Sequence, residues 1–171
     1  MIILGIDPGS RITGFGVIEV NRKTCHYVGS GCIRIQAETV AERLLEVFEG
    51  VQEVVARYQP ATAAIEKIFM YRGVDSALKL GQARGVAIVA MAAQKLEVSE
   101  YSARQVKQAV VGYGAADKTQ VQQMVKTLLK LQGIPQADAA DALAIALCHY
   151  HTQQSLLHMH GATKTVHKRL R

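Results

Sequence analysis

The sequence predicts an α/β fold in which a five-stranded mixed sheet is flanked by helices. Three β-rich stretches separated by short polar segments fill the first 35 residues, as expected for an antiparallel meander. Two more short apolar stretches, at 62–67 and 98–101, each follow a segment with helical periodicity. A strand reached through a helix returns parallel to an earlier strand, so these two should extend the sheet in parallel. A chain of 171 residues is long enough for one such domain.

The meander is predicted over residues 2–6, 13–20 and 25–35. The first of these stretches holds only aliphatic residues and glycine, which suits a strand buried on both faces. In the third, Gly29 and Gly31 predict a bulge or a kink.

Apolar residues then recur every three or four positions over 38–58, which predicts a helix with one buried face. The next predicted helix, 75–94, is almost wholly apolar after Arg84, so we expect it to be deeply packed. Gly81 and Gly85 lie four positions apart on one side of this helix and allow another backbone to approach closely. That neighbour is either the sheet or a second copy of the chain.

The C-terminal half is predicted to be helical. A short helix over 104–111 precedes a glycine-containing break, and Asp117 with Gln120 forms an N-capping pair for the next helix. Lys118 stands at the start of that helix, where a cation opposes the helix dipole, and this favours a functional role over a stabilising one.

The final predicted helix begins in PQADAADALAIALCHY, and its apolar periodicity ends at about residue 153. We therefore divide the chain into a folded domain, 1–152, and a basic, mobile tail, 153–171.

The net charge of +6 lies in the C-terminal part, because basic and acidic residues balance over the first hundred positions. This asymmetry indicates a phosphate-backbone partner, with a basic solubilising face as the alternative. Three widely spaced cysteines without a metal-binding pattern, together with the lack of an apparent leader or membrane span, predict a cytoplasmic protein.

Four acidic residues occupy positions where an unpaired carboxylate is costly. Asp7 directly follows the first strand, and Glu66 comes at the end of the strand over 62–67. Asp138 and Asp141 lie three apart on one face of the last helix, where small alanines allow close contact with the sheet. Taken singly, Asp7 could cap its own turn and the helix pair could be a solvated first turn. Together they predict an oxygen-rich site suited to Mg²⁺ or Mn²⁺.

Two other features remain open. Phe69 lies in an unusually apolar loop, 68–73, where it either stacks on a nucleic-acid base or packs against the sheet. Four histidines close to the C-terminus, in the last helical turn and the tail, suggest a structural zinc site, although no acidic residue lies near them in sequence.

Five blocks of sequence together resemble the RuvC family of Holliday-junction resolvases, which have the RNase H-like fold. The blocks are IILGIDPGS, AIEKIF, DSALKLGQARGVA, ARQVKQAVVGYGAADK and PQADAADALAIA, in this order within about residues 1–150. The resemblance implies an endonuclease that resolves four-way DNA junctions by two symmetric, metal-dependent cuts in recombination and repair. It also implies a homodimer that works with the branch-migration proteins RuvA and RuvB.

The same resemblance implies the roles of particular residues. The catalytic and metal-binding set would be Asp7, Glu66, Asp138 and Asp141. The cofactor would be Mg²⁺, two ions per active site, with Mn²⁺ able to substitute. Lys118 would stabilise charge developing on the phosphate. We assign DNA contacts to Phe69, Arg72, Arg104, Lys107 and Lys118.

Three other interpretations compete with this one. An ATPase or sugar kinase of the actin and Hsp70 type also begins with an acidic, glycine-rich turn, but those proteins duplicate the fold and this sequence has no second copy of the motif. A non-catalytic junction-binding module would not need four acids. The third alternative is a nuclease of the same fold that acts on RNA or on linear DNA. Only a cleavage assay distinguishes it from a junction resolvase.

Overall fold

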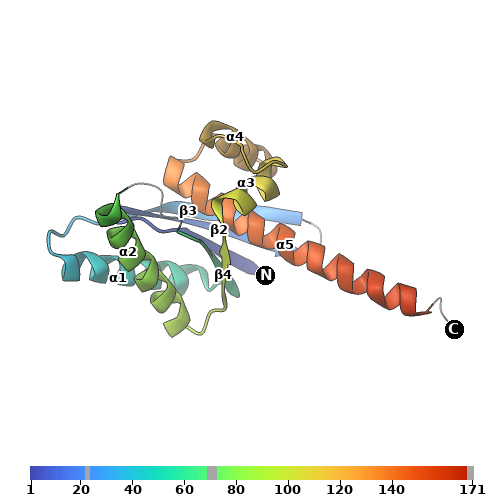
Figure 1. Cartoon of the computed structure of the whole chain (residues 1–171), viewed down its shortest axis with the longest axis horizontal. Helices are drawn as coiled ribbons and strands as arrows, with labels where there is room; N and C mark the ends of the chain where they lie inside the picture. The colour runs from blue at the N-terminus through green and yellow to red at the C-terminus, as the bar shows by residue number, and fades with distance from the viewer. Residues whose placement is uncertain (22–23, 69–72, 169–171) are drawn as a thin grey trace.

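The computed structural model describes the backbone of residues 1–21, 24–68 and 73–168, with side chains as far as residue 156. Figure 1 shows the strands and helices of these residues. The strands are β1 (Ile2–Asp7), β2 (Ile12–Asn21), β3 (Thr24–Arg34), β4 (Thr62–Glu66) and β5 (Val98–Tyr101). The helices are α1 (Val40–Tyr58), α2 (Val74–Ala93), α3 (Ala103–Val111), α4 (Lys118–Leu128) and α5 (Ala137–Lys168).

The strands form one mixed sheet in the order β3-β2-β1-β4-β5. β1, β2 and β3 pair antiparallel, whereas β4 runs parallel to both β1 and β5. The predicted five-stranded sheet, with a meander followed by parallel strands, is therefore confirmed. The predicted irregularity is also present, because the β2–β3 register shifts beside Gly29 and leaves Val28 as an extra residue.

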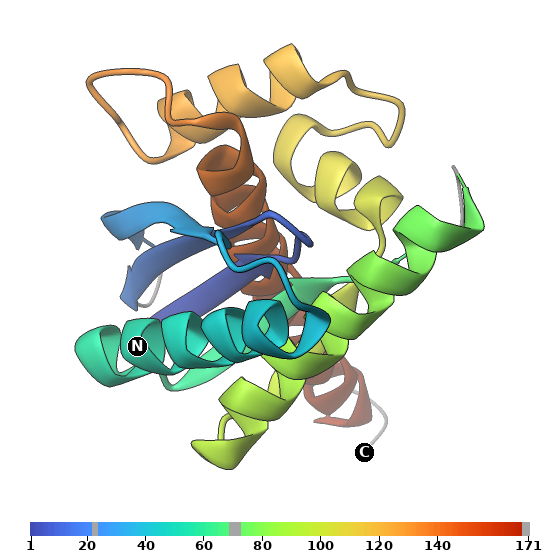
Figure 2. The same ribbon diagram turned by 90° about the vertical axis from the view of Figure 1, so that its left-hand side faces the viewer.

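Helices cover both faces of the sheet (Figure 2). α1 and α2 pack on one face, around a core that includes Leu4, Ile6 and Ile65. α3, α4 and α5 cover the other face, around a core that includes Ile3 and Leu143. β1 lies at the centre, so its successive side chains alternate between the two cores.

Small residues let α5 lie directly on the sheet. A Cβ added to Gly5 would stand 2.1 Å from the carbonyl oxygen of Ala142, and one added to Gly16 would stand 2.5 Å from the backbone nitrogen of Leu143. At Gly14 the added Cβ would lie 2.1 Å from the carbonyl oxygen of Asp138. The helix therefore approaches β1 and β2 to a distance that only glycine permits.

The prediction that α2 is deeply packed is wrong for one side of the helix. Ala83, Ala87 and Met91 are buried, but Leu78 and Val89 are 62% and 58% exposed. Apolar composition alone does not tell which side of a helix is covered within the same chain. None of the described helices is long and apolar enough to cross a membrane.

The last helix is longer than predicted, since α5 continues to Lys168 instead of ending near residue 152 (Figure 1). Loss of apolar periodicity reports the end of burial, whereas helix propensity persists through residues such as Gln, Leu and Met. The division into a domain over 1–152 and a mobile tail over 153–171 stays a prediction.

Candidate active site

Asp7 is the last residue of β1, and the turn after it is closed by a buried threonine. The Thr13 hydroxyl donates to the carbonyl oxygen of Gly9 at 3.1 Å and accepts from the Gly9 backbone N–H at 3.3 Å. Asp7 pairs with Gly14 across the antiparallel ladder. By strand alternation, Asp7 then shares with Ile3 and Gly5 the face on which α5 lies.

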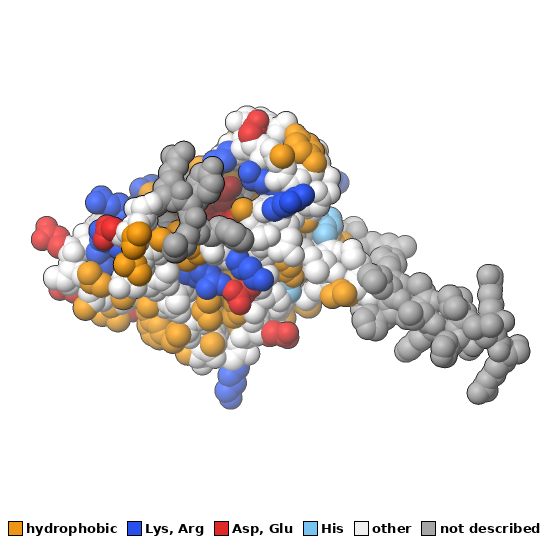
Figure 3. Space-filling model, viewed as in Figure 1, with side chains coloured by type: hydrophobic (Ala, Val, Ile, Leu, Met, Phe, Trp, Pro, Cys, Tyr) orange, Lys and Arg blue, Asp and Glu red, His pale blue; other side chains and the backbone are white. Residues whose placement is uncertain are grey.

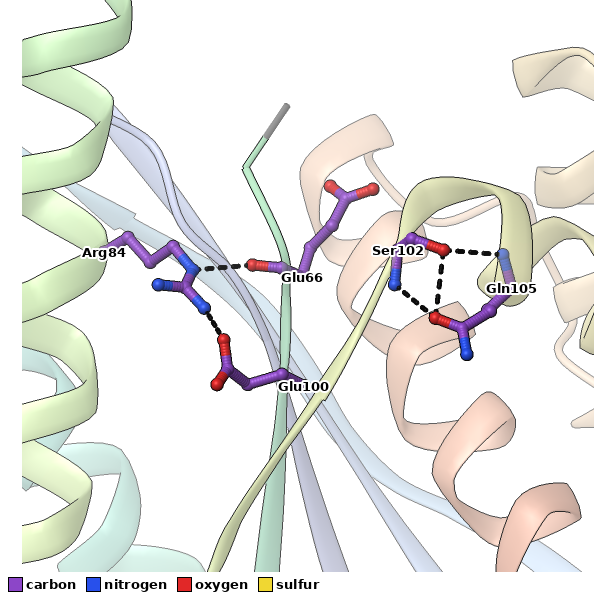
Figure 4. Close-up of polar contacts among 5 residues, drawn as sticks. All are labelled: Glu66, Arg84, Glu100, Ser102 and Gln105. Carbon is purple, nitrogen blue, oxygen red and sulfur yellow. Dashed lines mark hydrogen bonds and ion pairs between the residues drawn. The ribbon is translucent and has the colours of Figure 1, made fainter. Parts of the chain in front are cut away.

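Glu66 ends the neighbouring parallel strand, β4. Ile6 pairs with Ile65, so Glu66 follows in register beside Asp7 and on the same face of the sheet. Figure 4 shows that its carboxylate points away from Arg84, whereas its backbone carbonyl faces that residue. The carbonyl oxygen accepts a 2.9 Å hydrogen bond from Nε of Arg84.

Asp138 and Asp141 lie in the first turns of α5, opposite the ends of β1 and β4. The close contact of Gly14 with the backbone of Asp138 sets the distance between this helix and the sheet. The surrounding alanines, Ala139, Ala140 and Ala142, are buried, as the sequence predicted. Four carboxylates from two strands and one helix thus converge on one edge of the sheet.

Two lysines border these acids. Lys118 is the first residue of α4, whose start is fixed by a capping box between Asp117 and Gln120. Its Nζ lies 3.4 Å from Oδ2 of Asp141. Lys107, on α3, lies close enough for its charge to oppose the rise in the pKa values of Glu66 and Asp141. Figure 3 shows acidic side chains recessed below α3 and α4, with basic side chains nearby.

The acids are electrostatically crowded. The pKa of Asp7 is raised to about 8, first by burial and then by the charges of Asp141, Glu66 and Asp138, against the opposing effect of Lys118. Burial also raises the pKa of Glu66 and of Asp141. For Asp141, the charge and hydrogen bond of Lys118 offset this rise only in part, because the lysine side chain is 78% exposed and the pair is screened by water.

This donor set fits divalent metal ions. Four clustered carboxylates offer hard oxygen ligands, and bound cations would relieve the repulsion that raises the pKa of Asp7. Among the described residues, however, no three acidic, histidine or cysteine side chains already stand in positions to hold one ion together. The carboxylates would have to turn toward one another, and Asp141 would have to exchange its contact with Lys118.

The remaining predicted residues have different outcomes. Phe69 and Arg72 lie outside the described residues. Arg104 is exposed on α3, and its side chain lies against Gly114, where an added Cβ would meet its Cγ at 2.5 Å. His149 has a structural role: its Nδ1 lies 2.9 Å from the hydroxyl of Tyr101 in the core below β5.

Sequence reasoning missed two residues that lie beside the site. Arg84 donates a hydrogen bond to the backbone of Glu66. It is the only charged residue between Lys79 and Lys95, and a lone charge in an apolar helix could have indicated a specific buried partner. Cys32 lies opposite Gly14 on β3, and burial and the charge of Asp138 raise the pKa of its thiol. Nothing in the local sequence of Cys32 indicated this neighbourhood.

A mixed sheet of this order, with acids at the ends of its adjacent central strands facing a helix that carries two more, defines a nuclease of the RNase H-like class. Comparison with known proteins narrows the class. The family model for crossover junction endodeoxyribonuclease RuvC matches residues 3–149. A curated relative of that name from Pseudoalteromonas atlantica is 60% identical over 171 residues, which cover 99% of each chain.

Solved structures agree with this assignment. Thermus thermophilus RuvC in complex with a Holliday junction substrate is similar with a TM-score of 0.84 and 35% identity, over 91% of this chain and 96% of that one. The yeast mitochondrial Holliday junction resolvase Ydc2 shares the fold, with a TM-score of 0.68 at 16% identity over 96% and 85% of the two chains. The chain belongs to the RuvC family of crossover junction endodeoxyribonucleases, which are metal-dependent nucleases.

Proposed function

We propose that Asp7, Glu66, Asp138 and Asp141 form a metal-dependent site that resolves four-way DNA junctions by two symmetric cuts, leaving 5′-phosphate and 3′-hydroxyl ends. The observation that carries this proposal is the convergence of four acids from β1, β4 and α5 on one face of the sheet. Membership of the RuvC family supplies the substrate class.

The four carboxylates would hold two Mg²⁺ ions, with Mn²⁺ as a substitute. When bound, such ions activate the attacking water and neutralise charge on the leaving oxygen. Asp7 would contribute to holding both ions, because it lies close enough to the other three acids for their charges to raise its pKa. Lys118, whose side chain is largely exposed beside Asp141, would donate to a non-bridging phosphate oxygen as charge develops there.

The DNA backbone would be held by basic residues around this edge. Lys107 and Lys118 are near enough to affect the pKa values of the acids, so a phosphate in the site would meet both lysines. Arg104, on the same helix as Lys107, is proposed to contact a neighbouring phosphate. For Phe69 and Arg72 the proposals of base stacking and DNA contact rest on the sequence alone.

A cleavage assay tests the proposed function. Junctions should be cut in Mg²⁺ or Mn²⁺ but not in EDTA, and Ca²⁺ should support little cutting because its looser coordination does not enforce the geometry of the site. Linear duplexes and RNA–DNA hybrids of the same sequence should remain intact. Equal cutting of hybrids or duplexes would show that the substrate is not specifically the four-way junction. Full activity in EDTA would refute a metal site.

We further propose that the protein acts as a homodimer through α2. One set of four acids cuts one strand, whereas a four-way junction needs two symmetric cuts. Val74, Leu78 and Val89 form an apolar stripe along α2 with exposed fractions of 70%, 62% and 58%. Between them, Gly81 and Gly85 have no atoms within 4 Å of an added Cβ. The stripe therefore offers a flat apolar surface on which a second copy can pack, and Figure 3 shows hydrophobic atoms on this side of the molecule.

Replacing Leu78 with Glu should produce a monomer, because it places a charge in the middle of the stripe. Sedimentation at micromolar concentration should show twice the chain mass for the parent and the single mass for this variant. Leu45→Glu on α1 is the matched control, since Leu45 is 52% exposed but lies outside the stripe. A Leu78→Glu protein that still sediments at twice the chain mass would show that the subunits contact each other through another surface.

Two proposals follow from the family. RuvA and RuvB would deliver the junction to the dimer. The protein would work in the cytoplasm, which agrees with the free thiols of Cys25, Cys32 and Cys148 among the described residues.

A further inference from the structure

Two hydrogen bonds hold the end of β4, one to α2 and one to β5. Toward α2, the carbonyl oxygen of Glu66 accepts the hydrogen bond from Nε of Arg84 at 2.9 Å. Toward β5, the backbone N–H of Lys67 donates to the carbonyl oxygen of Tyr101 at 2.8 Å. Glu66 is the last residue of its strand, so these contacts set the direction of its Cα–Cβ bond at the point where the ladder ends.

Arg84 makes a second contact with the same group. Its terminal nitrogen is paired with the carboxylate of Glu100 on β5, so one guanidinium joins α2 to the ends of two adjacent strands (Figure 4). The Arg84 side chain is only 19% exposed. A planar guanidinium presents its donors at fixed angles. The two contacts therefore fix the distance of the ends of β4 and β5 from α2.

We infer that Arg84 is a positioning residue, which acts through the backbone of Glu66 to aim its carboxylate at the metal site. This inference rests on the metal-binding role proposed for Glu66. Figure 4 shows the geometry: Arg84 holds the carbonyl on one side of β4, and the carboxylate extends on the other. A group beyond the ligands that fixes their orientation typically changes metal affinity or activity by about 10- to 100-fold when removed.

Arg84 could instead serve only to tie α2 to the sheet through Glu100. The Glu100 side chain is 45% exposed, and ion pairs in contact with water contribute little to stability. Glu100→Gln removes the charge of that partner but leaves the donation from Arg84 to Glu66 in place. It is therefore the matched control for a change at Arg84.

The test compares Arg84→Met, Arg84→Lys, Glu100→Gln and Glu66→Gln. Mn²⁺ binding to the junction-free protein is measured by electron paramagnetic resonance, together with single-turnover cutting, junction affinity and Tm. We expect Arg84→Met to weaken Mn²⁺ binding about 10-fold and to slow cutting without changing junction affinity. Higher Mn²⁺ concentration should restore part of the rate. Arg84→Lys keeps the charge but lacks the planar fork of donors, so it should be intermediate. It replaces Arg84→Met in the test if the Met variant does not fold.

A double-mutant cycle shows whether Arg84 acts through Glu66. In a Glu66→Gln background, Arg84→Met should cost no further Mn²⁺ affinity. The inference is overturned if Arg84→Met, or Arg84→Lys in its place, binds Mn²⁺ as the parent does, or if its loss is fully additive with that of Glu66→Gln. It is also overturned if Glu100→Gln reproduces the whole effect. If Glu66→Gln itself changes neither Mn²⁺ binding nor cutting, the proposed metal role of Glu66 fails first.

Discussion

A protein with Asp7→Asn is expected to bind four-way junctions as tightly as the parent while cutting them at least about 100-fold more slowly. Affinity comes from phosphate contacts of lysine and arginine, which the change leaves in place. In the proposed site, the chemistry would depend on the Asp7 carboxylate, whose pKa responds to the other three acids. Loss of a ligand should exceed the 10- to 100-fold effects typical of groups that only orient ligands. Junction affinity and single-turnover cutting, measured on the same preparation, give the comparison.

Melting temperatures of the parent and of Asp7→Asn, measured at several pH values, show that the variant is folded and test the crowding of Asp7. The folded-state pKa of Asp7, about 8, lies above its unfolded value, so the folded state retains the proton more strongly. The resulting stabilisation is complete below about pH 4 and is lost as the pH rises toward 8. Asparagine carries no charge at any pH. In EDTA, the Tm of the variant should therefore exceed that of the parent by a margin that grows from pH 5 to pH 8.

Mg²⁺ should reverse this order, because an ion bound only to the folded parent stabilises the parent alone. Glu53→Gln on the exposed side of α1 makes the same kind of change away from the site and should leave all these measurements unaltered. An Asp7→Asn protein that loses binding and cutting equally, with a normal Tm, would contradict a purely catalytic role. A Tm margin that does not depend on pH would contradict the crowding of Asp7 by its neighbours.

Much of the site could be predicted because its signals are local. An aliphatic run that stops at Asp7, or a short strand that stops at Glu66, predicts an acid at the end of a buried strand. The alanines around Asp138 and Asp141 likewise predict a helix that lies close to the sheet. The convergence of these acids also agreed with the family resemblance, which supplied the roles.

The parts that could not be predicted depend on residues distant in sequence. Arg84 becomes important only because the folded chain brings Glu66 and Glu100 beside it. The exposed stripe on α2 has the same apolar composition as a buried helix face. A surface for a second subunit and a surface for the sheet both need apolar residues, so composition alone does not distinguish them. Gly14 was part of a predicted strand. Its role in allowing close approach of the backbone depends on α5, which lies more than a hundred residues later in the sequence.

Gly14→Ala is expected to damage the site without touching any of the four acids. The added Cβ would lie 2.1 Å from the carbonyl oxygen of Asp138, whereas carbon and oxygen normally approach to about 3.3 Å. The start of α5 would therefore have to withdraw by about 1 Å, and Asp138 and Asp141 would move away from Asp7. A misplacement of that size can cost roughly 100-fold in rate.

Mn²⁺ binding to the junction-free protein, single-turnover cutting and Tm measure the effect of this change. We expect weaker Mn²⁺ binding, about 100-fold slower cutting and a loss of about 1–3 kcal/mol of stability, which is the usual cost of overpacking. Junction affinity should be nearly unchanged, because the added Cβ contacts Asp138 and none of the basic residues on α3 and α4. Gly133→Ala is the control, since its added Cβ meets no atom within 4 Å. Parent-like Mn²⁺ binding and cutting by a folded Gly14→Ala protein would show that the separation of α5 from the sheet does not set the geometry of the acids.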